Sequence, residues 1–228
     1  MGTRTMAGWD VVWDEQTRTG LETALNEAEV VGLRLNSSDQ TCELLLHVCA
    51  QPERATGDPD PRRVLRLLRA TRIRVLLRED RLGDYGPAIP LADLDDVESF
   101  FRSIGGWDAM YGWEYLDRPS RTDDWPEEPS LTVDLRPGPA SHSLFWFTEC
   151  WKPGDDTRLC IEGTVDFEDL EITYADRTAE PLEQFIAEGR LWWDVLFGRT
   201  KHPPQVQVTS AEAPSWRGRR PGSTFVGG

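Results

Sequence analysis

Two stretches of the chain, residues 31–50 and 131–150, share one alternating pattern of apolar and polar positions. A shift of one hundred residues places Leu35 on Leu135 and Leu44 on Leu144, with turn-forming residues between the apolar runs of both stretches. Strict alternation is typical of a β-strand with one buried face, because successive side chains point to opposite sides. The pattern predicts a strand–turn–strand unit that occurs twice.

The order of the predicted elements repeats as well. In residues 29–104 and again in 130–198, predicted strands are followed by a helix that opens on Pro-Leu. We interpret the chain as α+β, with two tandem, similar antiparallel-sheet units, each backed by a helix, that arose by internal duplication. Alternation alone produces some of these matches, since only two identities fall between Val31 and Leu46.

Composition divides the chain into five parts. They are an N-terminal strand and helix (1–28), a first α+β half (29–117), a linker (118–129), a second α+β half (130–198) and a flexible basic tail (199–228). The linker is rich in proline and polar residues, as segments between domains are. The tail has no hydrophobic periodicity, which is typical of an unpacked terminus.

The most unusual strand prediction is the arginine-rich stretch 62–78. Its second half alternates arginines with the apolar residues Ile73, Val75 and Leu77, which indicates a strand. We expect the strand to be broken near residues 70–71. A helix is the competing interpretation for residues 62–70, because their apolar positions also fit a helical period.

A charge exchange distinguishes the two halves. The outward positions of the first half hold Arg72 and Arg74, whereas the matching positions of the second half hold Asp169 and Glu171. We predict that these strands lie close together and neutralise each other, either between the two halves or between the subunits of a homodimer. Exposed pairs of this kind contribute only about 0–1 kcal/mol each, so they would set register more than stability.

The overall charge excludes several classes of partner. The net charge is −15, from 40 acidic and 25 basic residues. Binding to nucleic-acid phosphates needs a basic surface, so a nucleic-acid partner is not expected. No apolar run approaches the roughly 18 residues of a membrane span, and the N-terminus lacks the apolar segment of a secretory signal. The sequence therefore predicts a cytoplasmic protein with no membrane partner.

The strongest candidate for a binding site is an aromatic and acidic region. Between residues 79 and 128, fourteen acidic residues face four arginines. Aromatic rings beside carboxylates can anchor a protein interface, hold a cation or stack on a sugar, although such rings can equally close a core. The candidate partner-binding residues are Trp107, Asp108, Tyr111, Trp113, Glu114, Asp123, Asp124 and Trp125.

Motifs that would identify a reaction are missing from the sequence. It contains no GxSxG, Walker, GxGxxG, CxxC or HExxH pattern, so we predict no catalytic residue, metal site or cofactor. The sequence favours a non-enzymatic acidic interaction module that captures a basic protein, as inhibitors and immunity proteins do. The alternatives are a carbohydrate- or small-ligand-binding protein that uses the tryptophan-rich insert, and an enzyme of unidentified class with a site between the two halves.

Overall fold

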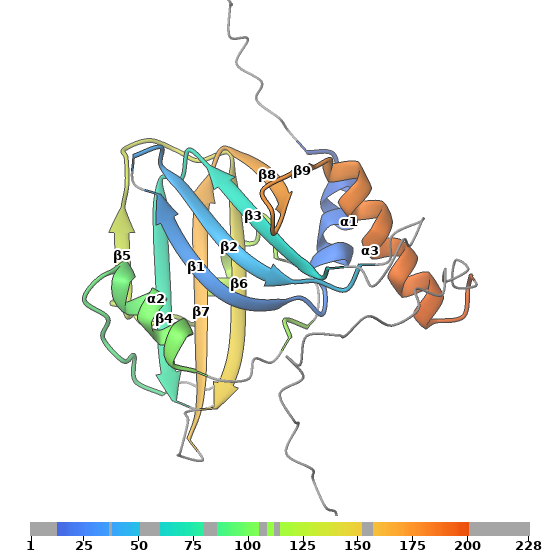
Figure 1. The fold of residues 1–228 in the computed structure, drawn as a ribbon. Coiled ribbons are helices and arrows are strands. Elements are labelled where there is room, and N and C mark those ends of the chain that lie inside the picture. The colour runs from blue at the N-terminus through green and yellow to red at the C-terminus, as the bar shows by residue number, and fades with distance from the viewer. Residues whose placement is uncertain are drawn as a thin grey trace, which may run out of the picture.

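The structure is a computed structural model that describes residues 13–36, 38–50, 60–79, 86–104, 109–111, 115–151 and 157–200. Within these ranges the chain forms an α+β fold of strands, three α-helices and one short 3-10 helix (Figure 1). In chain order the elements are α1 (Glu15–Leu25), β1 (Glu29–Asn36), β2 (Thr41–His47), β3 (Arg62–Leu68), β4 (Arg72–Glu79), α2 (Leu94–Ser103), η1 (Pro119–Thr122), β5 (Leu131–Asp134), β6 (His142–Trp151), β7 (Arg158–Phe167), β8 (Asp169–Tyr174), β9 (Ala179–Glu180) and α3 (Leu182–Leu196).

The strands form two antiparallel sheets. Sheet A has the order β1-β2-β3-β8-β9, and sheet B has the order β5-β4-β7-β6. Leu33, Leu44 and Leu65 stand in one register row of sheet A and are buried in the core. Their neighbours along each strand point the other way, as the alternation in the sequence predicts.

A bent pair of strands joins the two sheets. β3 is followed directly by β4, and both pair antiparallel with the segment that contains β7 and β8. Between the last pair in sheet A and the first pair in sheet B, residues 69–71 lie opposite residues 167–168. One extra residue on one side is a β-bulge, which bends and twists a strand pair. The bulge includes Arg69, whose φ angle is +51°.

The two sheets do not correspond to the two halves of the sequence. Sheet A joins β1–β3 to β8 and β9, and sheet B places β4 between β5 and β7. β1 and β2 form a hairpin, but β5 and β6, the predicted second hairpin, lie at opposite edges of sheet B. The α+β class with antiparallel sheets is confirmed, but the expectation of two tandem sheet units, one in each half, is wrong, and internal duplication is not confirmed. Alternation recurs because every strand with one buried face shows it, whichever strand lies beside it.

The arginine-rich stretch 62–78 folds as the predicted broken strand. β3 and β4 lie on either side of residues 69–71, where the bulge interrupts the pairing. The helix considered for residues 62–70 is wrong, because β3 pairs with β2 on one side and with β8 on the other. Pairing on both sides satisfies the backbone N–H and C=O groups of β3, so these groups do not need the internal hydrogen bonds of a helix.

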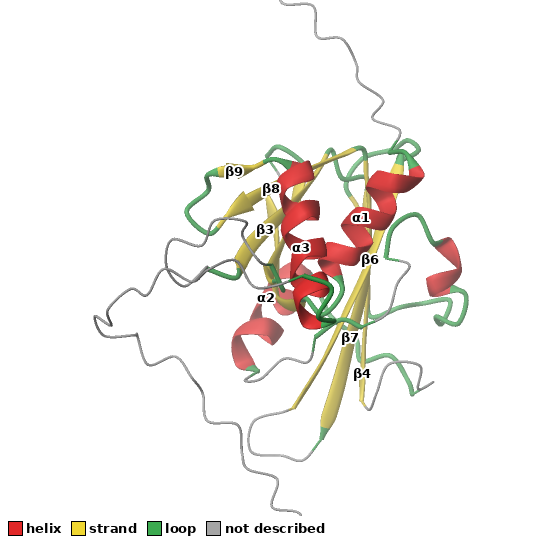
Figure 2. Cartoon of the chain, turned by 90° about the vertical axis from the view of Figure 1, so that its right-hand side faces the viewer, coloured by secondary structure: helices red, strands yellow, loops and turns green. Residues whose placement is uncertain are grey.

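Helices cover the core outside the two sheets. α2 lies against β1 and buries Val97 and Phe101, and the Phe101 ring meets the ring of Trp146. α1 and α3 pack side by side (Figure 2). Their close approach depends on Gly189, because a Cβ atom there would lie 2.6 Å from Ala24.

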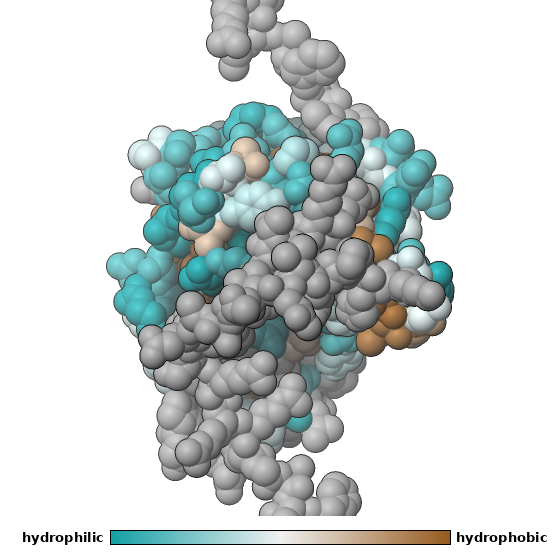
Figure 3. Space-filling model, turned by 45° about the vertical axis from the view of Figure 1, so that its right-hand side comes forward, coloured by the Kyte–Doolittle hydropathy of each residue, from teal (hydrophilic) through white to brown (hydrophobic). Residues whose placement is uncertain are grey.

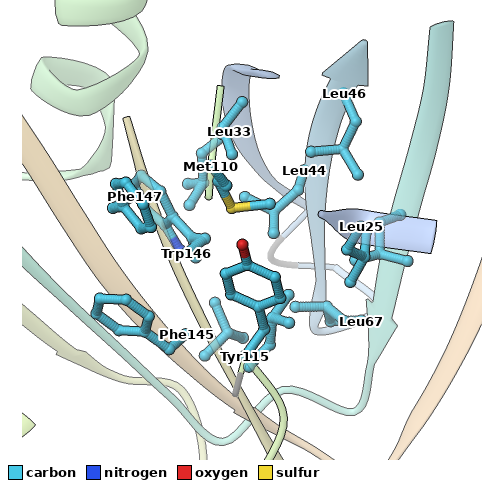
Figure 4. Close-up of a cluster of buried hydrophobic side chains, with 14 of the residues drawn as sticks. Leu25, Leu33, Leu44, Leu46, Leu67, Met110, Tyr115, Phe145, Trp146 and Phe147 are labelled. Atoms are coloured by element: carbon cyan, nitrogen blue, oxygen red, sulfur yellow. The ribbon is translucent and has the colours of Figure 1, made fainter. Parts of the chain in front are cut away.

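Large side chains fill the centre of the core (Figure 4). Trp146 and Tyr115 are completely buried, and Leu44 is 1% exposed. The indole of Trp146 lies directly on Gly163 of the neighbouring strand, where a Cβ atom would come within 2.3 Å of the ring. Glycine is therefore required at that position of β7 by the side chain that faces it.

Candidate functional site

The structure places half of the candidate partner-binding residues. Trp107, Asp108, Trp113 and Glu114 lie outside the described residues. The other four lie on either side of residues 112–114, and the stretch that follows these residues lies against the outer face of sheet B through Arg121 and Trp125. The four are Tyr111, Asp123, Asp124 and Trp125.

Trp125 attaches this segment to sheet B. Its side chain is 9% exposed, and the guanidinium of Arg74 on β4 lies 5.1 Å from its ring centre. Its Nε1–H donates a hydrogen bond of 3.3 Å to Glu162 on β7. Glu162 is itself held in a buried ion pair with Arg78. Trp125 is therefore an anchor in the fold, and its ring is not free to stack on a sugar.

Further contacts fix the backbone before and after Trp125. The 3-10 helix η1 precedes it, and the Trp125 N–H donates to the Thr122 carbonyl at 3.1 Å. Arg121 lies with its guanidinium 5.4 Å from the ring centre of Phe145 on β6. On the other side of Trp125, Ser130 exchanges hydrogen bonds with the backbone of Leu77 on β4. Residues 123–128, which we call the acidic loop, are thus held at both ends.

The acidic loop presents four exposed carboxylates within six residues. None of the four has a hydrogen bond or ion pair through its side chain within the described chain. They are Asp123, Asp124, Glu127 and Glu128. Pro126 separates the two pairs and restricts the backbone between them. The loop is therefore a constrained display of negative charge that the fold itself does not neutralise.

Other acidic clusters in the described chain have a structural role. At the start of α2, Asp93 accepts a hydrogen bond from the Asp96 N–H at 3.1 Å, and Asp96 accepts one from the Ala92 N–H at 2.8 Å. Carboxylates at a helix N-terminus satisfy free N–H groups and complement the helix dipole. Two of the acidic residues between 79 and 128 are therefore explained by the capping of α2.

On the outer face of sheet A, carboxylates are paired with arginines. One register row reads Arg34, Glu43, Arg66 and Glu171 from β1 to β8. Glu43 accepts a hydrogen bond from Arg34 at 2.8 Å, and Arg66 donates to Glu171 at 2.5 Å. Burial raises the pKa of Glu43, but hydrogen bonds from Arg177 and Arg34 outweigh it and hold the pKa below its usual value. The row neutralises itself.

The residues predicted to form ion pairs between the halves contact other residues instead. Arg72 and Arg74 lie on β4 in sheet B, whereas Asp169 and Glu171 lie on β8 in sheet A. Arg72 donates to Asp134 at 2.6 Å. Glu171 pairs with Arg66, and Asp169 lies 4.0 Å from Arg69. Arginine–carboxylate pairs do connect the two halves, but the structure does not bring these four residues together.

Two members of the acidic loop, Glu127 and Glu128, are absent from the candidates drawn from sequence. Their signal is a run of acids on both sides of a tryptophan and a proline, in a stretch that reads as a linker.

The candidate Tyr111 is 53% exposed, with its ring edge against Phe147. The other large apolar side chains exposed in the described chain are Trp151, Leu196 and Phe197. On the face shown in Figure 3, the coloured residues are mostly hydrophilic, with a few hydrophobic ones among them.

Comparison with known proteins found no match. No protein-family model matches the chain, and neither a curated protein nor a solved structure matches it. Within the described ranges, no group of three or more His, Cys, Asp and Glu side chains is arranged to hold a metal ion. None of the described helices combines the length and the apolar character needed to cross a bilayer.

Proposed function

We propose that the protein is a non-enzymatic interaction module, cytoplasmic in location, whose acidic loop binds a basic segment of a partner protein. The observation that supports this is the set of four exposed, unpaired carboxylates at Asp123, Asp124, Glu127 and Glu128. Most arginines of the sheets are engaged with carboxylates of their own, whereas the acidic loop places four uncompensated carboxylates within six residues. A concentrated charge attracts an oppositely charged partner from a distance and speeds association.

Anchoring makes the acidic loop a better ligand than a flexible tail would be. A loop that is ordered before binding loses less conformational freedom when a partner arrives. The contacts of Trp125 with Arg74 and Glu162 provide this order. The same contacts disfavour a carbohydrate-binding role for Trp125, because its ring is used inside the fold. The acidic display is therefore the function that this geometry supports best.

The proposal is tested with a nona-arginine peptide as the probe, by isothermal titration calorimetry. In the triple variant Asp123→Asn, Asp124→Asn, Glu127→Gln, three carboxylates of the loop become neutral at nearly constant shape. Exposed ion pairs contribute about 0.5 kcal/mol each, so roughly tenfold weaker binding is expected. Binding of the unchanged protein should also weaken strongly between about 50 and about 300 mM NaCl, because exposed charges are screened.

A matched control separates the loop from net charge. The variant Glu15→Gln, Asp39→Asn, Glu183→Gln also removes three exposed carboxylates that have no ion pair in the described chain. It should bind the peptide as the unchanged protein does. Equal loss of affinity in both triple variants would show that only overall charge matters, and the acidic loop would then be no specific site.

A further inference from the structure

A pocket lies at the corner where the bulge joins the two sheets. Its volume is about 580 Å³, within the range of sites that hold small molecules. The lining comes from the bulge, from the segment after β5 and from the end of β7. It comprises Thr71, Arg72, Asp134, Leu135, Arg136, Pro137, Gly138, Pro139, Ala140 and Asp166.

Backbone hydrogen bonds through Thr71 hold the walls of this corner pocket together. The Thr71 N–H donates to the Asp166 carbonyl at 2.8 Å, and the Thr71 carbonyl accepts from the Leu135 N–H at 2.8 Å. Thr71 belongs to the β-bulge, a feature over-represented next to functional sites. The neighbouring Arg69 has a positive φ, which a non-glycine residue adopts at a cost of about 1–3 kcal/mol. The fold thus maintains a strained corner around the pocket.

Not every charged side chain around the corner pocket is held in an ion pair. Arg72 stands between Asp134 and Asp166 in the register of β5, β4 and β7, and it donates to Asp134 at 2.6 Å. Arg136 is ion-paired with Glu168. Asp166 is half-buried and has no hydrogen bond or ion pair through its side chain within the described chain. The cations that line the pocket are engaged, and Asp166 is not.

An unpaired, half-buried carboxylate does not help the fold. Loss of water contact raises the pKa of Asp166, against the opposing attraction of Arg72 and Arg74. Arg72 is engaged by Asp134 and Arg74 by the Trp125 ring, and neither donates a hydrogen bond to Asp166, so burial of this carboxylate remains costly. Such groups in a cleft are typical of functional sites. A ligand with a positive charge would offset this unfavourable burial.

We propose that the corner pocket binds a small organic monocation, a protonated amine or guanidinium on a short apolar body, with Asp166 as its counter-ion. Leu135, Pro137, Pro139 and Ala140 supply an apolar wall for the body of the ligand. An anion is disfavoured because Asp166 repels it and the lining arginines already have carboxylate partners. A metal ion is disfavoured because Asp134, the other lining carboxylate, is engaged by Arg72.

The probe that tests this site is benzylamine, added to the whole chain near pH 7 and followed by protein-observed NMR. Saturable shifts at the corner pocket are expected, with a dissociation constant on the order of 1 mM for a ligand of this size. Benzyl alcohol and benzoate, which share the ring but lack the positive charge, should not bind there. If neither benzylamine nor n-butylguanidine shifts corner-pocket resonances below about 50 mM, or if benzoate binds equally well, the proposal is contradicted.

Two variants make the test specific. Asp166→Asn should weaken benzylamine binding at least tenfold, whereas the exposed control Asp39→Asn should leave it unchanged. Asp166→Asn should not lower the melting temperature, because the variant loses no side-chain hydrogen bond and burial already disfavours the charged carboxylate more than Arg72 and Arg74 favour it. A clear fall in melting temperature would show that Asp166 serves the fold, which would contradict the proposal. The acidic-loop triple variant should bind benzylamine normally, so the two proposals fail independently.

Discussion

The guanidinium of Arg74 lies over the indole of Trp125, 5.1 Å from the ring centre. This contact links the middle of sheet B to a segment that reads as a linker in the sequence. A cation over a tryptophan face contributes about 0.5–2 kcal/mol, with the larger values when the pair is shielded from water. Because the carboxylates of the acidic loop flank Trp125, the contact also sets where the negative charge is displayed.

Trp125 should be the main attachment of the acidic loop. Trp125→Ala is expected to cost about 3–5 kcal/mol of unfolding free energy, as for other buried aromatic side chains. Trp125→Phe keeps a ring over Arg74 but loses the hydrogen bond to Glu162, and should cost about 1–2 kcal/mol. Urea denaturation measures both. The control Trp151→Ala, at a side chain 47% exposed, should cost under about 1 kcal/mol. Equal losses at the two tryptophans would deny Trp125 this role.

Gly163 should tolerate no side chain. In Gly163→Ala the new Cβ would lie 2.3 Å from the Trp146 ring, so the indole or the strand must shift. Overpacking of this kind costs about 1–3 kcal/mol. Gly86→Ala is the matched control, because in the described chain the atom nearest to its Cβ would be the Glu79 carbonyl oxygen, at 3.6 Å. Thermal unfolding compares the two, and a Gly163 variant as stable as the Gly86 variant would show that Trp146 relaxes freely.

The buried ion pair of Arg63 should matter more than any exposed pair. Arg63 donates to Glu180 at 2.5 Å and to Glu188 at 3.4 Å, and all three side chains are at most 7% exposed. Arg63→Met would leave two buried carboxylates without a cation, at a cost of about 3–5 kcal/mol. The comparison is Arg102→Met, whose side chain is 70% exposed, with an expected cost of about 0–1 kcal/mol. Chemical denaturation of both variants decides whether burial sets the difference.

Glu180 should give stability a measurable pH dependence. Burial raises its pKa above the usual value, although hydrogen bonding to Arg63 opposes the shift. A group with a raised pKa binds more protons in the folded state, so its stabilising contribution is present below the unfolded pKa of about 4.3 and is lost as pH rises through the folded pKa. Relative to Glu180→Gln, the unchanged protein should lose unfolding free energy from about pH 4 upward. A difference that is constant with pH would contradict the raised pKa.

The local sequence determines which segments of this protein form strands, but it does not determine which strands pair with each other. Alternation is a property of single strands, which is why the break in the stretch 62–78 could be predicted before the fold was known. Which strand lies beside which depends on packing across the whole chain. Residues 31–46 and 131–146 have the same spacing but fold differently. The first stretch forms a true hairpin of β1 and β2, whereas β5 and β6 in the second stretch lie at opposite edges of sheet B.

The two candidate sites differ in the same way. The carboxylates of the acidic loop are neighbours in sequence, so Asp123 and Asp124 could be selected from charge and composition. The sequence also shows that Trp125 is close to them. It does not show that Trp125 is buried, because Arg74 and Glu162 come from distant strands. The corner pocket gives no signal in sequence at all, since strand pairing brings Asp134 and Asp166 to either side of one arginine.

The most direct measurement of the central claim is an amide NMR titration of the whole protein with the nona-arginine peptide. If the acidic loop is the binding site, the largest shift changes should cluster at residues 121–128 and at the β4 and β7 positions beneath Trp125. They should disappear together when salt is raised. Shift changes spread evenly over the acidic surface, or centred on the capping acids of α2, would contradict the account.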